Sequence, residues 1–214
     1  MFDLDGTLVD SRRDIAESAN AVLEACGCAP HSEEAIGGMV GDGAAHLIAR
    51  AFAAAECSAP PDALERFLRV YNSRLLRFTR PYPGVLELLD ALSARGSLAV
   101  LTNKPYGATQ AILDELGLAS HFGELVLGGD GPHPRKPDAA GLTQLMTAAG
   151  VLSANTLMVG DSVVDFRTAR SAGAQACVAR YGFGFHDFPV AELNASDRVI
   201  DCPLDLLTTL DVFN

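Results

Sequence analysis

Long hydrophobic runs are missing from this sequence of 214 residues. Although 49% of the residues are hydrophobic, no uninterrupted apolar segment approaches the roughly 20 residues that a membrane-spanning helix needs. The start of the chain also lacks a basic segment followed by an apolar core and a cleavage site, because the acidic residues begin at Asp3. We therefore expect a soluble, cytoplasmic protein with no membrane partner.

Basic residues are scarce. The chain has 16 Lys and Arg against 27 Asp and Glu, which gives a net charge of −11. Nucleic acids and anionic membranes bind clusters of basic side chains, so this composition argues against both as partners. An anionic small molecule would have to be attracted by a few local charges, and Lys104 and Lys136 are the only lysines. We expect a monomer or a homodimer.

Cysteine is sparse as well, with five residues, an odd number that cannot all pair within one chain. Cysteines in a chain without an export signal are normally reduced, so we expect free thiols. Cys26 and Cys28 form a C-x-C pair, which we interpret as small buried residues at a helix end rather than as a metal site.

The chain has two regions with different hydrophobic patterns. Residues 11–80 have helical patterns throughout, whereas short apolar segments alternate with amphipathic segments after Gly84. The predicted strands are residues 97–103, 124–129, 156–161 and 175–180, and the predicted helices are residues 85–96, 107–117, 139–150 and 163–173. This alternation indicates a doubly wound, Rossmann-like parallel sheet with helices on both faces. We predict an α/β core domain from residues 1–12 and 83–214, with a helical cap domain, residues 13–82, inserted after the first strand.

The first predicted strand is short. In "MFDLDGTLVD" only Met1 and Phe2 precede Asp3, whereas a central strand usually has about five or more residues. Either this strand is unusually short, or the sequence lacks a few apolar residues that normally precede the motif, and we favour the second explanation.

Polar side chains end three of the predicted strands. Asp3 and Asp5 end the first strand, where positions i and i+2 project to the same face and bring two like charges together. Residues 102–103, Thr-Asn, end the next strand, and Asp161 ends another, with Asp165 four residues later on one face of a helix. The carboxyl ends of parallel strands meet at one edge of a sheet, so we expect these groups to converge. Four carboxylates at one edge offer the oxygen ligands that Mg²⁺ prefers.

Lys136 lies in "RKPD", just before a predicted helix, and its compact ammonium group suits a phosphoryl oxygen or a carboxylate. The segments "DLDGT", "LTNK", "RKPD" and "GDSVVD", in this order and spacing, resemble the four motifs of the haloacid dehalogenase superfamily of phosphohydrolases. The match covers essentially the whole chain. The helical insertion resembles the mobile cap of the subfamily that includes phosphoglycolate phosphatases, with "IGGMVGDGA", "VLTNKP" and "YGFG" closest to that group.

The resemblance implies a role for each of these groups. Asp3 would be the nucleophile that attacks phosphorus and forms an aspartyl-phosphate, and Asp5 would be the general acid and then the general base. Mg²⁺ would be bound by the Asp3 side chain, the Asp5 backbone carbonyl and Asp161. Lys136 would neutralise Asp3 and the phosphate, and Asp165 would orient Lys136 or a metal-bound water.

Substrate contacts are implied in both parts of the chain. Thr102 and Asn103 would hydrogen-bond the transferring phosphoryl group. In the cap, "GDGAAHLIAR" starts with glycines whose N–H groups, at Gly43 and its neighbours, could bind a small carboxylate. His46 and Arg50, at i and i+4, would add donors on one face, unless this pair is only a solvated helix surface. The best single candidate substrate is 2-phosphoglycolate, and other small phosphate monoesters stay open.

Two other functions are compatible with some of these groups. A sugar-phosphate mutase of the same superfamily, similar to phosphoglucomutase, would have to shield its aspartyl-phosphate from water. A phospho-acceptor signalling module of the receiver type combines acids, Thr or Ser, Lys and Mg²⁺ on a doubly wound sheet, but it is much shorter and has no helical insertion. We therefore predict a magnesium-dependent phosphatase that acts on a small phosphate monoester.

Overall fold

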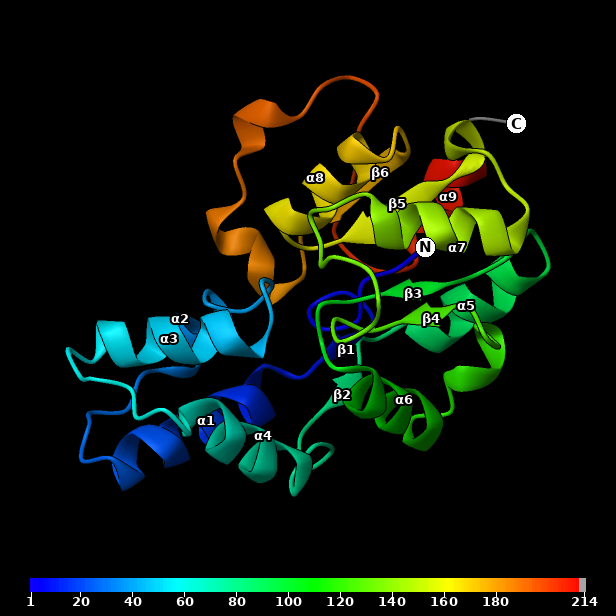
Figure 1. Cartoon of the computed structure of the whole chain (residues 1–214). Coiled ribbons are helices and arrows are strands. Elements are labelled where there is room, and N and C mark those ends of the chain that lie inside the picture. Colours follow the sequence, from blue (N-terminus) through cyan, green and yellow to red (C-terminus); the bar gives the residue numbers. More distant parts are fainter. Residues whose placement is uncertain (212–214) are drawn as a thin grey trace.

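The computed structural model describes residues 1–211, and Figure 1 shows a sheet-bearing part beside a group of helices. The strands are short and their bounds are β1 Val9–Asp10, β2 Arg80–Pro81, β3 Val100–Leu101, β4 Val126–Leu127, β5 Leu157–Gly160, β6 Gln175–Ala179 and β7 Arg198–Ile200. Four of the predicted strands are confirmed as β3 to β6, while β7 was not predicted. Its three residues, Arg-Val-Ile, are too few and do not alternate between apolar and polar types, so the sequence carries no strand signal there.

Residues 1–3 lie in the middle of the sheet. Phe2 forms parallel bridges to Val100 of β3 and to Val159 of β5. Together with the β3–β4, β5–β6 and β6–β7 pairs, all parallel, these bridges give the order β4, β3, residues 1–3, β5, β6, β7. The central segment is as short as the sequence predicts, and its Met1 amine donates to the Leu157 carbonyl at 3.0 Å.

Successive side chains of each strand lie on opposite faces of the sheet and pack into two apolar layers. On β6, Cys177 and Ala179 belong to one buried cluster, and Ala176 and Val178 belong to the other. The first cluster includes residues of α5, α6 and α9, and the second includes residues of α7 and α8. These helices have the bounds α5 Val85–Ser93, α6 Tyr106–Glu115, α7 Ala140–Ala149, α8 Val163–Ser171 and α9 Asp205–Asp211. The predicted doubly wound α/β architecture is therefore confirmed.

The remaining α-helices form the helical cap (Figure 1), with bounds α1 Arg12–Ala25, α2 Glu33–Gly37, α3 Ala44–Ala54 and α4 Ala63–Asn72. Their apolar stripes pack on one another, because α1 contacts α2, α3 and α4. The two connections to the sheet-bearing part run side by side, since β1 and β2 pair in antiparallel register, Val9 with Pro81 and Asp10 with Arg80. Both predicted ends of the cap lie beside this ribbon, although the division itself stays a prediction.

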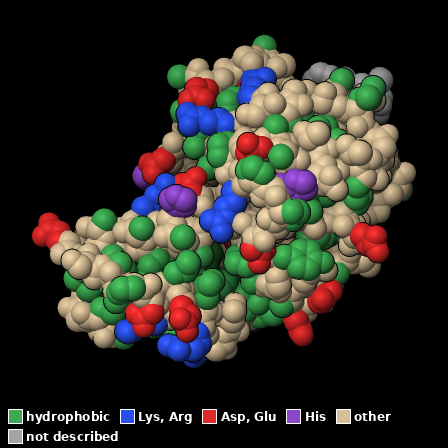
Figure 2. All heavy atoms as spheres, in the orientation of Figure 1, with side chains coloured by type: hydrophobic (Ala, Val, Ile, Leu, Met, Phe, Trp, Pro, Cys, Tyr) green, Lys and Arg blue, Asp and Glu red, His purple; other side chains and the backbone are tan. Residues whose placement is uncertain are grey.

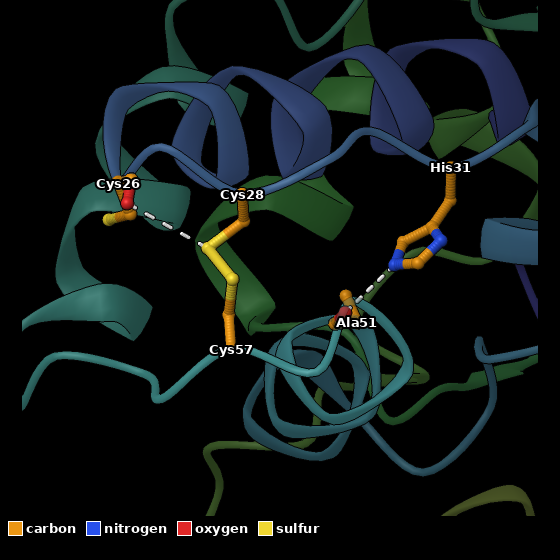
Figure 3. Close-up of a disulfide and its surroundings, with 5 residues drawn as sticks. All are labelled: Cys26, Cys28, His31, Ala51 and Cys57. Carbon is orange, nitrogen blue, oxygen red and sulfur yellow. Dashed lines mark hydrogen bonds between the residues drawn. A yellow bond between two sulfur atoms is a disulfide. The ribbon is translucent and has the colours of Figure 1, made fainter.

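The cysteines differ from the expectation of five free thiols. Cys28, just after α1, and Cys57, just after α3, form a disulfide with Cα atoms 6.2 Å apart (Figure 3). Cys26, Cys177 and Cys202 are free. The prediction was wrong for this pair because 29 residues separate the two cysteines, and only the packing of α1 against α3 brings them together. Cys26 is at the predicted helix end, as the C-cap of α1.

Within residues 1–211, no helix has both the length and the apolar character that crossing a membrane would require.

Candidate active site

The sheet order brings the predicted site residues to one edge. Asp3 ends the central segment, Thr102 follows β3 and Asp161 follows β5, and β3 and β5 lie on either side of the central segment. All three side chains are buried, together with those of Asp165 and Lys136. The convergence that the sequence predicts for the carboxyl ends of the strands is therefore present.

Asp3 and Asp165 share one lysine. The Lys136 ammonium group lies 2.8 Å from Asp3 Oδ1 and 2.5 Å from Asp165 Oδ1. Burial raises the pKa of Asp3 to about 7, although Lys136 opposes this shift. Burial would lower the pKa of Lys136, but Asp165 and Asp3 outweigh it and raise that pKa above its usual range. Lys136 is therefore a permanent cation beside Asp3.

Asp165 is fixed by its own helix. Its Oδ2 accepts hydrogen bonds from the backbone N–H and the hydroxyl of Ser162, which form a capping box at the start of α8. Oδ2 therefore caps the helix while Oδ1 contacts Lys136. The predicted role of Asp165, to orient Lys136 or a metal-bound water, stays a prediction.

Asp161 lies in a nest of glycines. Its Oδ2 accepts a 2.7 Å hydrogen bond from the Gly184 N–H. A Cβ atom at Gly6 or Gly182 would overlap the Asp161 carboxylate, and a Cβ at Gly184 would lie 2.9 Å from Oδ2. Gly6 also has φ +84, a conformation that L side chains rarely adopt. Two backbone segments, at residue 6 and at residues 182–184, thus approach this one carboxylate because their glycines carry no side chains.

The acidic cluster fits a divalent cation. Asp3, Asp161 and Asp165 each offer an oxygen within 4.8 Å of the others. Burial raises the pKa of Asp161 well above its usual range, and the negative charges of Asp165 and Asp3 add to the shift. One lysine cannot balance three buried carboxylates, so a second cation is needed to keep them ionised. A donor set made of oxygens fits Mg²⁺, with Asp3 and Asp161 as the side chains free to bind it.

Asp5 has a lysine of its own. Lys104 Nζ lies 3.1 Å from Asp5 Oδ1 and 3.0 Å from Oδ2, and the Ser11 hydroxyl donates to Oδ1. The same ammonium group donates to the hydroxyl of Tyr71, which comes from α4 of the cap. Asp5 therefore pairs with Lys104, and its carboxylate is not part of the acidic cluster of Asp3, Asp161 and Asp165.

Thr102 and Asn103 have partners within the protein. Thr102 Oγ1 accepts from the Lys104 N–H at 3.2 Å. The Asn103 amide donates to the carbonyls of Gly41 and Lys136 and accepts from the Lys136 N–H at 2.9 Å. Asn103 thus positions the backbone of Lys136 and contacts the cap, and both residues line the site cavity. Their predicted hydrogen bonds to a phosphoryl group stay a prediction.

The three candidate residues of the cap lie in different surroundings. Gly43 starts α3 with φ +93 and lines the cavity, and a Cβ there would lie 3.1 Å from Nη1 of Arg135. His46 and Arg50 do not line it: the His46 ring pairs with the Asp42 carbonyl, and the Arg50 guanidinium contacts Asp42 and the Met39 carbonyl. The structure therefore brings Gly43 to the site but not His46 or Arg50, whose contact with substrate stays a prediction.

The cavity of about 60 Å³ lies between the cap and the strand ends. Apolar side chains from the cap form one wall, and the acidic and polar groups of the core form the other. The cap residues are Ile15, Val40, Leu47, Phe67, Leu68 and Tyr71. Along the boundary above α2 and α3, charged side chains of both signs and histidines gather at the surface (Figure 2).

Sequence reasoning missed several contributors to this site. Lys104 carried a signal, as one of only two lysines in an acidic chain, but its partner could not be named. Tyr71 lies in the region predicted to be helical and belongs to none of the quoted segments. Gly6, Gly182 and Gly184 lie in "DLDGT" and "YGFG", but nothing in these two segments shows that they meet at Asp161.

Comparisons with known proteins agree with this geometry. Residues 1–179 match the family described as "Haloacid dehalogenase-like hydrolase". The chain is 45% identical over 204 residues to the phosphoglycolate phosphatase of Rhodospirillum rubrum, with 91% of this chain and 83% of the relative covered. It is 41% identical to that of Agrobacterium fabrum, with 94% and 87% covered. A predicted phosphoglycolate phosphatase from Haemophilus somnus has a similar crystal structure, with a TM-score of 0.87, 34% identity, and 98% and 96% covered.

Proposed function

This chain belongs to the haloacid dehalogenase-like hydrolases, and we propose that it is a magnesium-dependent phosphatase that hydrolyses 2-phosphoglycolate through an aspartyl-phosphate. The observation that carries the proposal is the buried group formed by Asp3, Lys136 and Asp161 at the carboxyl edge of the sheet. The names of the relatives support the choice of substrate.

Asp3 is the residue placed to attack phosphorus. Asp3 lines the cavity and its carboxylate pairs with Lys136 at 2.8 Å, so a fixed positive charge lies beside the carboxylate that attacks phosphorus. Attack by the carboxylate expels the alcohol and leaves the phosphoryl group on Asp3. A pKa of about 7 without a further cation means that Asp3 needs added positive charge to be fully ionised at neutral pH. Magnesium, when bound by Asp3 and Asp161, supplies that charge and stabilises the charge on the transferring oxygens.

Asp5 is the residue placed to move protons. It lies two positions from Asp3 and lines the same cavity. Ser11 and Lys104 fix the orientation of its carboxylate. From there Asp5 donates a proton to the departing alkoxide and then removes one from the water that hydrolyses the aspartyl-phosphate.

The cap excludes bulk water from the site. Its apolar wall lies over the strand ends, and excluding bulk water there strengthens each charge interaction in the site. The cap bounds of 13–82, a cytoplasmic location and a monomeric or homodimeric state stay predictions from the sequence.

The test is hydrolysis of 2-phosphoglycolate by the purified full chain, with phosphate release followed with and without Mg²⁺. We expect turnover that needs Mg²⁺, that chelator removes, and that exceeds turnover of hexose phosphates. A hexose phosphate turned over about a hundredfold faster, or converted to an isomer without phosphate release, would contradict the proposal and favour a sugar phosphatase or a mutase. A hundredfold preference corresponds to about 2.7 kcal/mol of transition-state discrimination.

A further inference from the structure

Lys104 is a buried cation that the hydrolytic steps above use only to orient Asp5. Its side chain is 5% exposed, and it lies three residues after the end of β3. Among the residues that line the site cavity in the described part of the chain, it is the only lysine or arginine. The other lining side chains are acidic, polar or apolar, and Lys136, which pairs with Asp3, does not line the cavity. Lys104 is therefore the lining side chain whose charge suits an anionic group on the leaving part of the ligand.

The partners of Lys104 come from both parts of the molecule. Its ammonium group contacts both carboxylate oxygens of Asp5, on the core side, and the hydroxyl of Tyr71, on the cap side. It also lies 4.4 Å from the centre of the Tyr71 ring. The Tyr71 hydroxyl accepts from Lys104 and keeps its own hydrogen, so it can donate to a further oxygen. Lys104 and Tyr71 together thus offer donors to one point of the cavity.

The position of Lys104 puts a positive charge beside the leaving group. Asp5 is the proposed proton donor to the leaving oxygen, and Lys104 contacts both oxygens of its carboxylate. A carboxylate on the leaving group would therefore lie close enough to pair with the Lys104 ammonium group, whereas an uncharged leaving group would not.

Distances limit where that carboxylate lies in the substrate. A leaving oxygen protonated by Asp5 must lie within about 3.2 Å of its carboxylate. Lys104 Nζ lies 3.0 Å from the same carboxylate. An acid group attached to the carbon that bears the leaving oxygen therefore falls within reach of Lys104. The small cavity, about 60 Å³, disfavours longer spacers.

We propose that Lys104, with Tyr71 from the cap, binds the carboxylate of the leaving group and so selects phosphate esters of short 2-hydroxy acids. This inference rests on the proposed phosphatase function and names the residues that give it substrate specificity. Because Tyr71 belongs to α4, the carboxylate is recognised only when the cap lies against the core.

The test compares two substrates that differ in the carboxylate alone, 2-phosphoglycolate and 2-hydroxyethyl phosphate. We expect wild-type kcat/KM to favour 2-phosphoglycolate at least a hundredfold, and Lys104→Gln to reduce this ratio at least thirtyfold, mainly through KM. Any loss caused by a misplaced Asp5 affects both substrates and cancels in the ratio. Lys104→Arg, the matched control, keeps the charge and should retain most of the preference.

Several outcomes would overturn the inference. A wild-type preference below tenfold, or an equal loss for both substrates in Lys104→Gln, would assign Lys104 to orienting Asp5 alone and leave the phosphatase function intact. If the protein hydrolyses neither substrate nor p-nitrophenyl phosphate in the presence of Mg²⁺, the proposed function itself is wrong, and the inference fails with it.

A measurement on the wild-type protein covers the case in which Lys104→Gln does not fold. 3-Phosphonopropionate has the shape of 2-phosphoglycolate but no ester bond, and propylphosphonate lacks its carboxylate. We expect the first to inhibit hydrolysis of p-nitrophenyl phosphate with a Ki at least tenfold lower than the second. Equal Ki values would overturn the inference.

Discussion

The two connections between the cap and the core are tied together by one buried carboxylate. Asp14, on the first turn of α1, is fully buried, and its Oδ2 accepts three hydrogen bonds of 2.8 Å. The donors are the N–H groups of Phe78 and Thr79 and the Thr79 hydroxyl, all just before β2. Asp14→Ala removes the acceptor and leaves three donors without it, two N–H groups and one hydroxyl.

The size of the effect follows from these contacts. Each buried donor left unpaired costs about 1–3 kcal/mol, and local rearrangement recovers part of this, so we expect a loss of about 3–5 kcal/mol in the free energy of unfolding. For a chain of 214 residues, each kcal/mol corresponds to about 2–4 °C, so the melting temperature should fall by about 6–20 °C. Thr79→Val removes only the hydroxyl donor and should cost about 1 kcal/mol.

The assay is urea unfolding followed by circular dichroism, with matched buffers and protein concentrations. Asp62→Ala is the control, because this acid is exposed and pairs with Arg66 on the surface, where such pairs contribute about 0–1 kcal/mol. A loss below 1 kcal/mol for Asp14→Ala, or one equal to that of Asp62→Ala, would refute the assignment of Asp14 as the tie between the connections.

Three further predictions concern the disulfide, the metal site and the central strand. Under denaturing, non-reducing conditions a thiol assay should find three free cysteines, and a count of five would contradict the pairing. The Cys28–Cys57 disulfide closes a loop of 29 residues, so its reduction should lower the free energy of unfolding by about 3–4 kcal/mol. Gly184→Ala adds a Cβ 2.9 Å from Asp161 Oδ2 and should weaken Mg²⁺ binding about tenfold in a calorimetric titration, and unchanged affinity would count against the glycine nest. Met1 lies beside a cavity of about 290 Å³, so adding a few β-branched residues before it should extend the central strand and raise the melting temperature without changing turnover. An unchanged melting temperature would contradict this prediction.

The core of the fold was readable from the sequence because each signal is local. Alternating apolar segments and glycine-ended helices predict the doubly wound sheet, and the strand order then brings Asp3 and Asp161 to one edge. The pairing of Lys136 with Asp3 and Asp165 fits the same edge, because Asp3 ends the central segment, Asp165 lies in the first turn of α8 and Lys136 lies in the loop before α7.

Features that depend on packing between distant segments were not readable. The Cys28–Cys57 disulfide needs α1 and α3 to pack, and Lys104 meets Tyr71 only because α4 lies over the strand ends. The helical pattern expected as far as residue 80 is not continuous, because α4 ends at Asn72 and the backbone N–H of Phe78 donates to Asp14 instead of to a helix carbonyl. Helical spacing alone cannot report such tertiary contacts.

The central claim, that Asp3 is the nucleophile of a phosphatase, is tested most directly by trapping the covalent intermediate. The full chain is mixed with Mg²⁺ and ³²P-labelled 2-phosphoglycolate, quenched in acid during turnover, digested, and the labelled peptide is identified. We predict a label on the peptide that contains Asp3, released by hydroxylamine and absent in Asp3→Asn, while Asp90→Asn, an exposed acid on α5, is labelled like the wild type. A label on another residue, or phosphate release without any labelled protein, would contradict the assignment.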